Sequence, residues 1–447
     1  GKLEEAVEAY NKAASIKPDY AEAFNNLGNV FKKQSKFERA IQAYNKAISL
    51  KPDFAFAHNN LGVTLYTVAS FSQDENQLEE ALMAFNNATE IKPDYAEAYN
   101  NKGKVLKDQG KLEEALIAFN KALEIKPDYS LVLNNIGNLL GEQGKLDEAI
   151  ETFNKALVLE PNFAEVHNNL GNVFKEKGDF QAARSHFDKV NDAASAAQSL
   201  ECTYFLGNYE TFNEQIDFLI EKQPTNIRVA SLSAFAAHQL NQKDRYPYCT
   251  DAIDLVTYSN IRNHVRDSEI FISEILSEMN QQKFAWEPKK HSTIGGFRTG
   301  SQLFYKPSKN LKTLQEIIQK ELNLFYSKCQ KKDELLFKYW PKKLDIAAWY
   351  IRLIKGGYQT AHIHPSGWVS GVIYLKTIEN PEKSEGAIKF GLHGHGYPII
   401  NPDYPKQIFQ PKNGDMVLFP SSLFHETIPV IQDKERCIIA FDLMSSS

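Results

Sequence analysis

The chain has 447 residues, of which 43% are apolar and 24% are charged. This composition is that of an ordinary globular protein, and the length leaves room for two to four domains with ample cores. No apolar run approaches the roughly 18 residues needed to cross a bilayer, and the net charge of -5 does not indicate binding to nucleic acid. We therefore expect neither a membrane protein nor a nucleic-acid-binding protein.

Cysteine usage predicts the compartment. The four cysteines lie far apart and show no C-x-x-C spacing, so neither a disulfide framework nor a zinc ribbon is indicated. They are Cys202, Cys249, Cys329 and Cys437. The reducing cytoplasm is therefore the expected location.

A period of 34 residues dominates residues 1–190. Prolines recur at intervals of 34, 41, 34 and 34 residues, and the long interval contains a seven-residue insert around residues 71–77. A period of this length is typical of stacked helix pairs. The fixed positions are Pro18, Pro52, Pro93, Pro127 and Pro161, the first-helix glycines Gly28, Gly62, Gly103, Gly137 and Gly171, and the second-helix aromatics Tyr44, Phe85, Phe119, Phe153 and Phe187. Residues 1–6 repeat 110–115, a position inside a repeat, so we expect the natural chain to continue upstream.

These positions resemble the tetratricopeptide repeat family over roughly residues 1–190. The resemblance implies a right-handed helical superhelix with a concave binding groove. The Asp or Asn that follows each proline, as in Asp19 and Asp94, is expected to cap the next helix.

A pair of asparagines recurs on the first helix of every repeat. The second members are Asn26, Asn60, Asn101, Asn135 and Asn169. Asparagine is a mediocre helix former, so its return five times indicates a use. The pattern resembles the asparagine ladder that lines the groove of the O-linked N-acetylglucosamine transferase superhelix, which implies binding to the backbone of an extended peptide. The alternative is a polar face copied by repeat duplication.

The rest of the chain is predicted to change from helix to sheet. Residues 191–243 keep a loose helical periodicity and are expected to be degenerate repeats that cap the solenoid. Residues 244–290 and 311–332 are also predicted to be helical. After Pro341, short branched and aromatic runs separated by turn residues predict antiparallel strands of a double-stranded β-helix, or jelly roll. The predicted class is a multidomain α + β chain with domains 1–190, 191–243 and 244–447.

Three histidines in the β-rich region form a candidate metal site. His362 and His364 are two residues apart, so on a strand they point the same way, and His425 follows on a later segment. Iron(II) centres use such ligands on one face and leave the opposite positions open for substrate and oxygen. Arg436, eleven residues after His425, has the planar fork that binds carboxylates.

The C-terminal region resembles the iron(II)- and 2-oxoglutarate-dependent oxygenases, in particular a bacterial and phage group. The shared words are H-I-H-P-S-G-W-V-S-G-V-I-Y-L, G-A-I-K-F, N-G-D-M-V-L-F-P-S-S-L-F-H-E-T-I-P-V and E-R-C-I-I-A-F-D. The resemblance implies that His362 and His425 bind iron. It also implies that Arg436 and Tyr374 bind the far carboxylate of 2-oxoglutarate, the cosubstrate that is consumed with O2.

The chain departs from this family at one ligand. The family motif is H-x-D, and here the third residue is His364. Either three histidines bind the metal, or His364 does not bind and two histidines hold the iron. A second H-x-H, His393 and His395, is surrounded by glycines and is interpreted as a mobile loop, with a substrate loop at the barrel mouth as the alternative.

The leading hypothesis is an oxygenase that hydroxylates a protein or peptide side chain, with prolyl hydroxylation favoured by the resemblance. The repeats would bind the flanking substrate chain. Two alternatives stay open: a scaffold whose barrel has lost its chemistry, and a small-molecule oxygenase whose repeats serve localisation.

Overall fold

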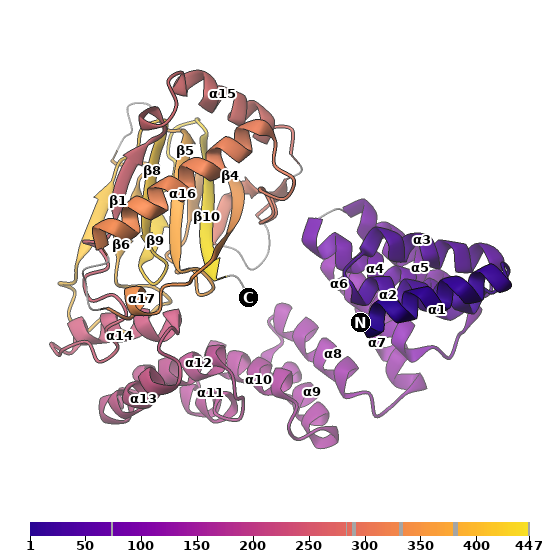
Figure 1. Ribbon diagram of the computed structural model, residues 1–447. Coiled ribbons are helices and arrows are strands. Elements are labelled where there is room, and N and C mark those ends of the chain that lie inside the picture. The colour runs from indigo at the N-terminus through magenta and orange to yellow at the C-terminus, as the bar shows by residue number, and fades with distance from the viewer. Residues whose placement is uncertain (73–74, 283, 288–291, 330–333, 379–382, 446–447) are drawn as a thin grey trace. The chain divides into compact units, whose positions relative to one another are not determined.

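The computed structural model describes residues 1–72, 75–282, 284–287, 292–329, 334–378 and 383–445 (Figure 1). The chain divides into two compact units, residues 1–190 and 191–447. The first unit is an array of helices, and the second contains two antiparallel sheets with flanking helices. The predicted fold class, a helical solenoid followed by a β domain, is confirmed.

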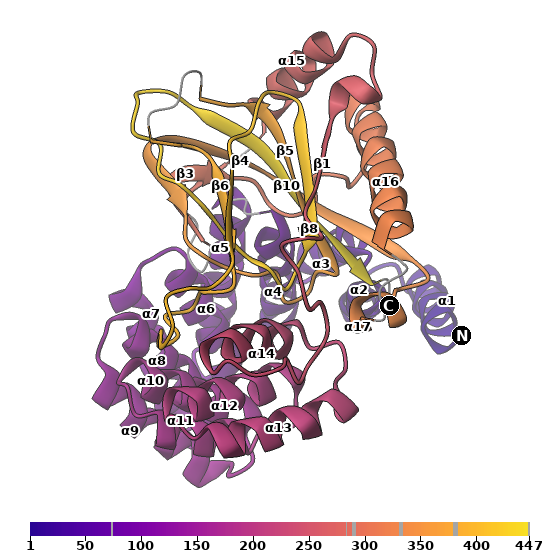
Figure 2. The same cartoon turned by 90° about the vertical axis from the view of Figure 1, so that its left-hand side faces the viewer.

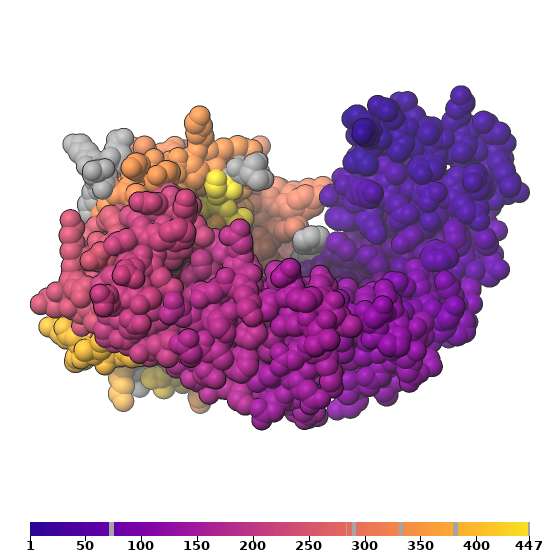
Figure 3. All heavy atoms as spheres, turned by 90° about the horizontal axis from the view of Figure 1, so that it is seen from below, coloured from indigo at the N-terminus to yellow at the C-terminus, as the bar shows by residue number. Residues whose placement is uncertain are grey.

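The first unit consists of helices that pair in sequence order. They are α1 (Lys2–Ile16), α2 (Ala21–Lys33), α3 (Phe37–Leu50), α4 (Ala55–Ser72), α5 (Glu75–Ile91), α6 (Ala96–Asp108), α7 (Leu112–Ile125), α8 (Ser130–Glu142), α9 (Leu146–Leu159), α10 (Ala164–Glu176) and α11 (Phe180–Phe187). The space-filling view shows this first unit as a curved band, coloured from indigo to purple (Figure 3). The predicted insert falls at the end of α4 and the start of α5, and its residues 73 and 74 lie outside the described residues.

The recurring glycine and aromatic residue form one contact. In the fourth repeat, a Cβ added at Gly137 would lie 2.5 Å from the ring of Phe153, which is fully buried between the paired helices. The other four repeats have the same contact between first-helix glycine and second-helix ring. Glycine is therefore required because the ring occupies the space of a side chain, and not because the backbone turns there.

The predicted caps at Asp19 and Asp94 are wrong. The N-cap residues of α2 and α6 are the following aromatics, Tyr20 and Tyr95, and neither helix end has a side-chain capping bond. A lysine ammonium lies over each of these rings, at 5.4 Å for Lys17 over Tyr20. The aromatic residue, packed by its lysine, starts the helix one position later than the aspartate would.

The second unit begins with three helices, α12 (Ala193–Phe205), α13 (Tyr209–Lys222) and α14 (Ile227–Gln239). Their buried residues belong to the same apolar core as the sheets. Further helices are α15 (Ser268–Met279), α16 (Lys309–Cys329) and the short α17 (Leu335–Lys338). In the part of the chain that the structure describes, no helix is both long and apolar enough to span a bilayer.

Within the residues that the structure describes, ten strands form two antiparallel sheets. They are β1 (Thr257–Asn260), β2 (Ala285–Trp286), β3 (Thr293–Arg298), β4 (Leu344–Gln359), β5 (Val369–Lys376), β6 (Ile388–Gly391), β7 (Lys406–Phe409), β8 (Asp415–Pro420), β9 (Phe424–Thr427) and β10 (Arg436–Ser445). The large sheet has the order β1-β8-β5-β10-β4-β3-β2, and the small sheet has the order β7-β6-β9. From β5 in the large sheet the chain passes to β6 and β7 of the small sheet, and then alternates between the sheets through β8, β9 and β10.

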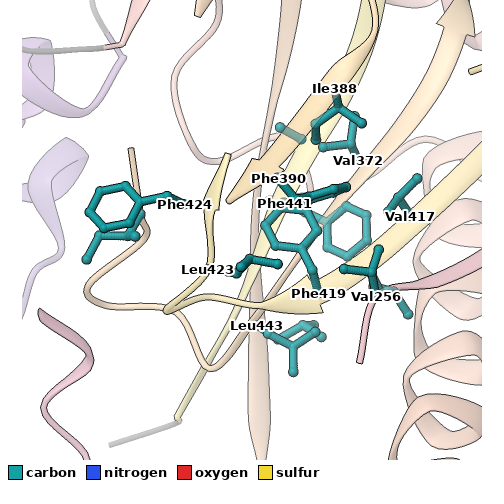
Figure 4. Packing of buried hydrophobic residues seen from close by; sticks show 14 of the residues in the cluster. Val256, Val372, Ile388, Phe390, Val417, Phe419, Leu423, Phe424, Phe441 and Leu443 are labelled. Atoms are coloured by element: carbon teal, nitrogen blue, oxygen red, sulfur yellow. The ribbon is translucent and has the colours of Figure 1, made fainter. Parts of the chain in front are cut away.

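The core lies between the two sheets. Phe390 of β6 and Phe419 of β8 contact each other with ring centroids 5.0 Å apart, and Phe441 of β10 lies beside them (Figure 4). Helix α16 covers the outer face of the large sheet with a buried apolar stripe that includes Leu314 and Ile318 (Figures 1 and 2). In the small sheet β7 is an edge strand, and its residues 406 and 408 are exposed.

The helical prediction for residues 244–290 is only partly right. Helix α15 is present, but residues 257–260 form β1, which pairs antiparallel with β8. Residues 293–298, which lie between the two segments predicted to be helical, form β3 beside β4. Both strands are stabilised by pairing with residues far away in the sequence, which local periodicity does not report.

Candidate active site

Three histidines converge at one end of the small sheet. His425 lies in β9, and its backbone pairs with that of His362 through two N–H···O bonds of 3.1 Å each. His364 follows two residues later, and its ring stacks on that of His425 with centroids 5.0 Å apart. One ring nitrogen of each histidine lies within 4.8 Å of the others. The structure thus brings together the three residues that the sequence singled out as metal ligands.

The hydrogen bonds of the rings assign their protons. Nδ1 of His362 lies 2.6 Å from the carbonyl of Thr360, and Nδ1 of His425 lies 3.2 Å from the carbonyl of Leu423. Nδ1 of His364 lies 2.8 Å from a carboxylate oxygen of Asp442. Each of these oxygens accepts, so each Nδ1 carries the proton and each Nε2 keeps a lone pair. This is the tautomer of a histidine that binds a metal through Nε2.

The lone pairs of His364 and His425 point at one another, whereas Nε2 of His362 lies 3.2 Å from the hydroxyl of Ser292, which can donate to it. Nε2 of His364 lies 3.2 Å from Nε2 of His425. Two unprotonated nitrogens at this distance repel unless a cation lies between them. Two nitrogens that bind one metal at about 2.1 Å and at right angles are about 3.0 Å apart. The observed spacing therefore fits two adjacent positions of a facial metal site.

Burial keeps the rings of His362 and His425 neutral. It lowers the pKa of His362 to about 3, with the neighbouring His364 as the second cause. Burial also lowers the pKa of His425 well below its ordinary value, and the other two histidines add to that effect. Because a metal competes with protons for a histidine, neutral rings at pH 7 are ready to bind one.

A carboxylate behind His364 was missed by the sequence reasoning. Asp442 of β10 is 8% exposed, and its Oδ1 accepts a hydrogen bond of 2.7 Å from Ser370. Ser370 in turn lies 2.8 Å from the hydroxyl of Ser421. A signal was present, because Asp442 is six residues after Arg436 on one strand and so shares its face.

Arg436 and Tyr374 form a buried cationic pair, and of the two only Arg436 lines the cavity beside the histidines. Arg436 is 1% exposed, its Nε donates to the carbonyl of Gly386 at 2.8 Å, and its guanidinium lies 5.1 Å from the centre of the Tyr374 ring. Nη1 of Arg436 and the hydroxyl of Tyr374 have no hydrogen-bonding partner among the described residues. Burial raises the pKa of Tyr374 to about 12, so its hydroxyl stays a donor. A buried charge with unused donors is costly unless an anion completes it.

One cavity joins the two sites. Its wall includes the three histidines and Arg436, together with polar Gln359 and Thr427 and an apolar patch. The apolar patch consists of Val372, Ile388, Phe419 and Ala440. The cavity wall therefore carries both metal-binding histidines and a guanidinium, the two kinds of group that a metal-bound dicarboxylate would contact.

A second cleft borders His425 from the outside. Its wall includes Lys389, which forms a 2.5 Å ion pair with Glu426, and also His393 and Tyr404. These last two lie on the segment between β6 and β7, whose glycine-rich start was interpreted as a mobile loop. The cleft gives the metal-binding end of the cavity a polar neighbourhood at the surface.

The β6–β7 segment is anchored to helices α12 and α14. The amide oxygen of Gln239 accepts from the backbone N–H groups of Ile400 and Asn401 at 2.7 and 2.8 Å, and its Nε2 donates to the carbonyl of Asn401. Tyr397 donates to the buried Glu201 at 3.1 Å. Helices 193–239, expected to cap the solenoid, thus hold a wall of the cleft. Neither His393 nor His395 belongs to the three-histidine group.

The asparagines of the repeats bond to each other. Nδ2 of Asn60 donates to Oδ1 of Asn25 at 3.0 Å, and Nδ2 of Asn169 donates to Oδ1 of Asn134 at 2.8 Å. Asn101 and Asn135 bond in the same way to the first asparagine of the repeat before. Asn26 of the first repeat receives a 3.4 Å contact from its neighbour Asn25. The recurrence therefore has a structural use, because most of these amides form hydrogen bonds between successive repeats.

Comparisons with known families agree with both units. Residues 347–442 match the sequence profile described as "Putative 2OG-Fe(II) oxygenase". Tetratricopeptide repeat profiles match within residues 1–196. The chain is thus a tetratricopeptide repeat protein that carries a 2OG-Fe(II) oxygenase domain, and this family implies iron(II) and 2-oxoglutarate. No curated protein matches the chain.

Solved structures match the helical part. YrrB, described as a TPR protein with an unusual peptide-binding site, is 25% identical and covers 41% of this chain and 91% of its own length, with a TM-score of 0.33. PilF of Pseudomonas aeruginosa is 22% identical, covers 53% of this chain and 100% of its own, and has a TM-score of 0.40. PilW, a type IV pilus biogenesis factor, is 21% identical, with coverages of 47% and 97% and a TM-score of 0.42.

Proposed function

We propose that this chain is an iron(II)- and 2-oxoglutarate-dependent hydroxylase that acts on a side chain of a protein or peptide, with proline as the first residue to test. The observation that supports this most is the shared cavity, whose wall carries both the three histidines and a buried, incompletely paired Arg436. Neither feature stabilises the fold by itself, and a metal-bound dicarboxylate would satisfy both.

The residues have distinct tasks in this proposal. His362, His364 and His425 hold the iron. Arg436 and Tyr374 bind the far carboxylate of 2-oxoglutarate with charge-assisted hydrogen bonds. Iron(II), 2-oxoglutarate and O2 supply the oxidising power that places a hydroxyl group on a C–H bond.

The apolar wall of the cavity excludes water around the bound cosubstrate. Phe419 and Val372 are nearly fully buried there, and their low-dielectric surroundings strengthen the interaction of Arg436 with a carboxylate. The outer cleft beside His425 is the place where the substrate side chain would enter, because it is the polar surface next to the metal ligands.

The repeats are proposed to hold the flanking substrate chain. The second asparagines are half-buried, and in Asn60, Asn101, Asn135 and Asn169 the Nδ2 atom bonds to the preceding repeat, so their amide oxygens are the proposed acceptors for the backbone N–H groups of an extended peptide. We place the protein in the cytoplasm because all four cysteines are buried thiols far apart in the sequence.

Succinate release tests the chemistry. Protein loaded with Fe(II) in air is expected to convert 2-oxoglutarate to succinate, faster with a peptide library than without. His362→Ala and His425→Ala are each expected to reduce this rate at least about 100-fold. A protein that binds neither metal nor 2-oxoglutarate would instead be the non-catalytic scaffold.

A second experiment tests the substrate class. The Asn101→Ala/Asn135→Ala double variant is expected to raise the KM for a peptide substrate and leave succinate release without peptide unchanged. Asn154→Ala, at an exposed asparagine of α9, is the matched control. If the double variant turns over its substrate with an unchanged KM, the repeats do not bind the substrate chain and a small-molecule substrate is favoured.

A further inference from the structure

The site contains a carboxylate, that of Asp442, but it contacts the His364 ring and does not stand at the ligand position itself. His364 stands where the H-x-D motif has an aspartate. Asp442 approaches its Nδ1 with both oxygens, at 2.7 Å for Oδ1 and 2.8 Å for Oδ2. The carboxylate is thus separated from the proposed metal position by a single imidazole ring.

Asp442 is itself held in place. Ser370 of the neighbouring strand β5 donates to its Oδ1 at 2.7 Å, and Ser370 and Ser421 lie 2.8 Å apart. A Cβ at Gly367 would lie 2.6 Å from the Ser421 hydroxyl, so the chain passes close to this group without a side chain. The carboxylate therefore has one position and one orientation relative to the imidazole.

The faces of the imidazole are also fixed. The ring of Trp349 in β4 stacks on His364 with centroids 5.7 Å apart and an interplanar angle of 14°. The ring of His425 stacks on it with an angle of 25°. The guanidinium of Arg298 lies 4.4 Å from the centre of the Trp349 ring, so a cation stands near the buried carboxylate. Stacking sets the ring plane, and Asp442 sets which nitrogen points at the metal.

We infer that Asp442 is the positioning residue that makes His364 a metal ligand and supplies, through the imidazole, the negative charge that the H-x-D carboxylate would supply directly. A hydrogen bond from Nδ1–H to a carboxylate raises the basicity of Nε2 and fixes the tautomer. Three neutral ligands would leave iron(II) one charge more positive than in the H-x-D site. A buried anion behind one of them offsets part of that difference.

Cobalt(II) titration tests the inference, which rests on the proposed metal centre. The full chain, stripped of metal, is titrated with Co²⁺, and the visible absorption bands report both affinity and ligand geometry. Asp442→Asn keeps an acceptor for Nδ1–H and removes the charge, so an affinity loss of about 10-fold with unchanged bands is expected. Asp442→Ala removes both, and a loss nearer 100-fold with altered bands is expected.

A double-mutant cycle separates positioning from folding. In a His364→Ala background, Asp442→Ala is expected to change the Co²⁺ affinity by less than about 2-fold, because the carboxylate then has no ligand to orient. Asp244→Asn, a half-buried carboxylate that also bonds to a serine but lies far from the histidines in the sequence, is the matched control and should bind Co²⁺ like the parent. Ser370→Ala replaces Asp442→Ala if the latter does not fold, with an expected loss of a few-fold.

The outcomes are distinguishable. The inference is overturned if Asp442→Asn and Asp442→Ala bind Co²⁺ like the parent, or if Asp442→Ala weakens binding equally in the His364→Ala background. If the parent chain binds no Co²⁺, the metal centre itself is overturned. If Co²⁺ binds with the expected dependence on Asp442 and no succinate is formed, only the proposed hydroxylase activity fails.

Discussion

The two units of this chain treat buried polar groups in opposite ways. In the repeats, buried asparagines such as Asn134 are paired by the next repeat, and the buried acceptors left over are neutral amide oxygens such as that of Gln109. In the C-terminal unit, a buried guanidinium and a tyrosine hydroxyl keep unused donors beside three histidine lone pairs. Polar groups satisfied within the chain stabilise the fold, whereas a buried charge with an unused donor, which costs more than a neutral amide oxygen, is the stronger indication of a ligand.

The largest expected effect comes from removing the unsatisfied charge. Arg436→Met is expected to weaken 2-oxoglutarate binding at least about 100-fold, because the cosubstrate carboxylate loses its charge-assisted hydrogen bonds. The melting temperature without ligand should stay equal or rise, since a buried unpaired cation is removed. Calorimetric titration and a thermal melt measure the two effects, with Lys155→Met at an exposed position as control. A melting temperature several degrees lower would make Arg436 a structural residue and erase the contrast between the units.

Replacing an asparagine that is hydrogen-bonded between repeats should lower the stability of the fold and leave 2-oxoglutarate binding unchanged. Asn134→Leu leaves the amide of Asn169 without its acceptor and removes the 2.8 Å bond to Glu165, so the free energy of unfolding should fall by about 1–3 kcal/mol. Binding of 2-oxoglutarate should not change. Denaturant unfolding followed by circular dichroism measures the loss, and Asn154→Leu at an exposed position should stay within about 0.5 kcal/mol of the parent. Equal losses from both substitutions would mean that the inter-repeat bonds contribute nothing specific.

Gln239 of α14 is a satisfied polar residue of the C-terminal unit, and it holds the segment between β6 and β7 by hydrogen bonds. Gln239→Ala removes three hydrogen bonds that fix residues 400 and 401, so local opening of the segment between β6 and β7 should become easier by about 1–2 kcal/mol. Chymotrypsin should then cut near Tyr397 about 10-fold faster, and Co²⁺ binding should be unchanged. Gln319→Ala, on the exposed side of α16, is the control. Unchanged cleavage would show that Gln239 does not hold this segment.

The smallest effect belongs to a histidine pair in the repeats. Nδ1 of His186 lies 3.0 Å from Nδ1 of His167, and burial, followed by the charge of His167, lowers the pKa of His186 to about 4. The unfolded chain therefore binds more protons than the folded one between about pH 6.5 and 4, so stability falls as the pH falls through this range. Because the ring is half-exposed, the loss should be about 1 kcal/mol or less.

Unfolding midpoints at pH 7.5 and 4.5 measure this loss. His186→Gln should unfold with a smaller difference between the two pH values than the parent. If both proteins lose the same stability, the pair has no role in the pH dependence of the repeats.

Features that depend on residues close together in the sequence could be predicted, and features that depend on distant residues could not. Repeats are visible because Gly137 and Phe153 recur at fixed spacing, and the histidine pair is visible because neighbours at i and i+2 share a strand face. The spacing of Asp442 from Arg436 indicated that the two share a strand face, but the contacts of Asp442 with Ser370 and His364 could not be predicted, because they depend on long-range contacts such as the pairing of β10 with β5. The predicted caps failed because the competing contact, a lysine over an aromatic ring, involves the residue beside the aspartate.

The same reasoning explains the segment after the repeats. Helices 193–239 keep the periodicity of the repeats, which predicted a solenoid cap, but periodicity does not report what an element contacts. Glu201 and Gln239 form hydrogen bonds with the segment between β6 and β7, at sequence separations of 196 and 162 residues. Polar residues on an apolar helical stripe were the available sign of such a contact.

Strand β10 carries both Arg436, near its start, and Asp442, near its end, and it is paired on both sides by β4 and β5. The two residues are six positions apart at about 3.3 Å each, so the strand fixes a spacing of about 20 Å between the arginine proposed to bind the cosubstrate and the carboxylate proposed to orient a metal ligand. A fixed spacing selects dicarboxylates by length, so a homologue of 2-oxoglutarate with one more methylene should be a poor substitute. A deletion of one residue in β10 would turn one of the two side chains to the opposite face and disconnect the anchor from the metal.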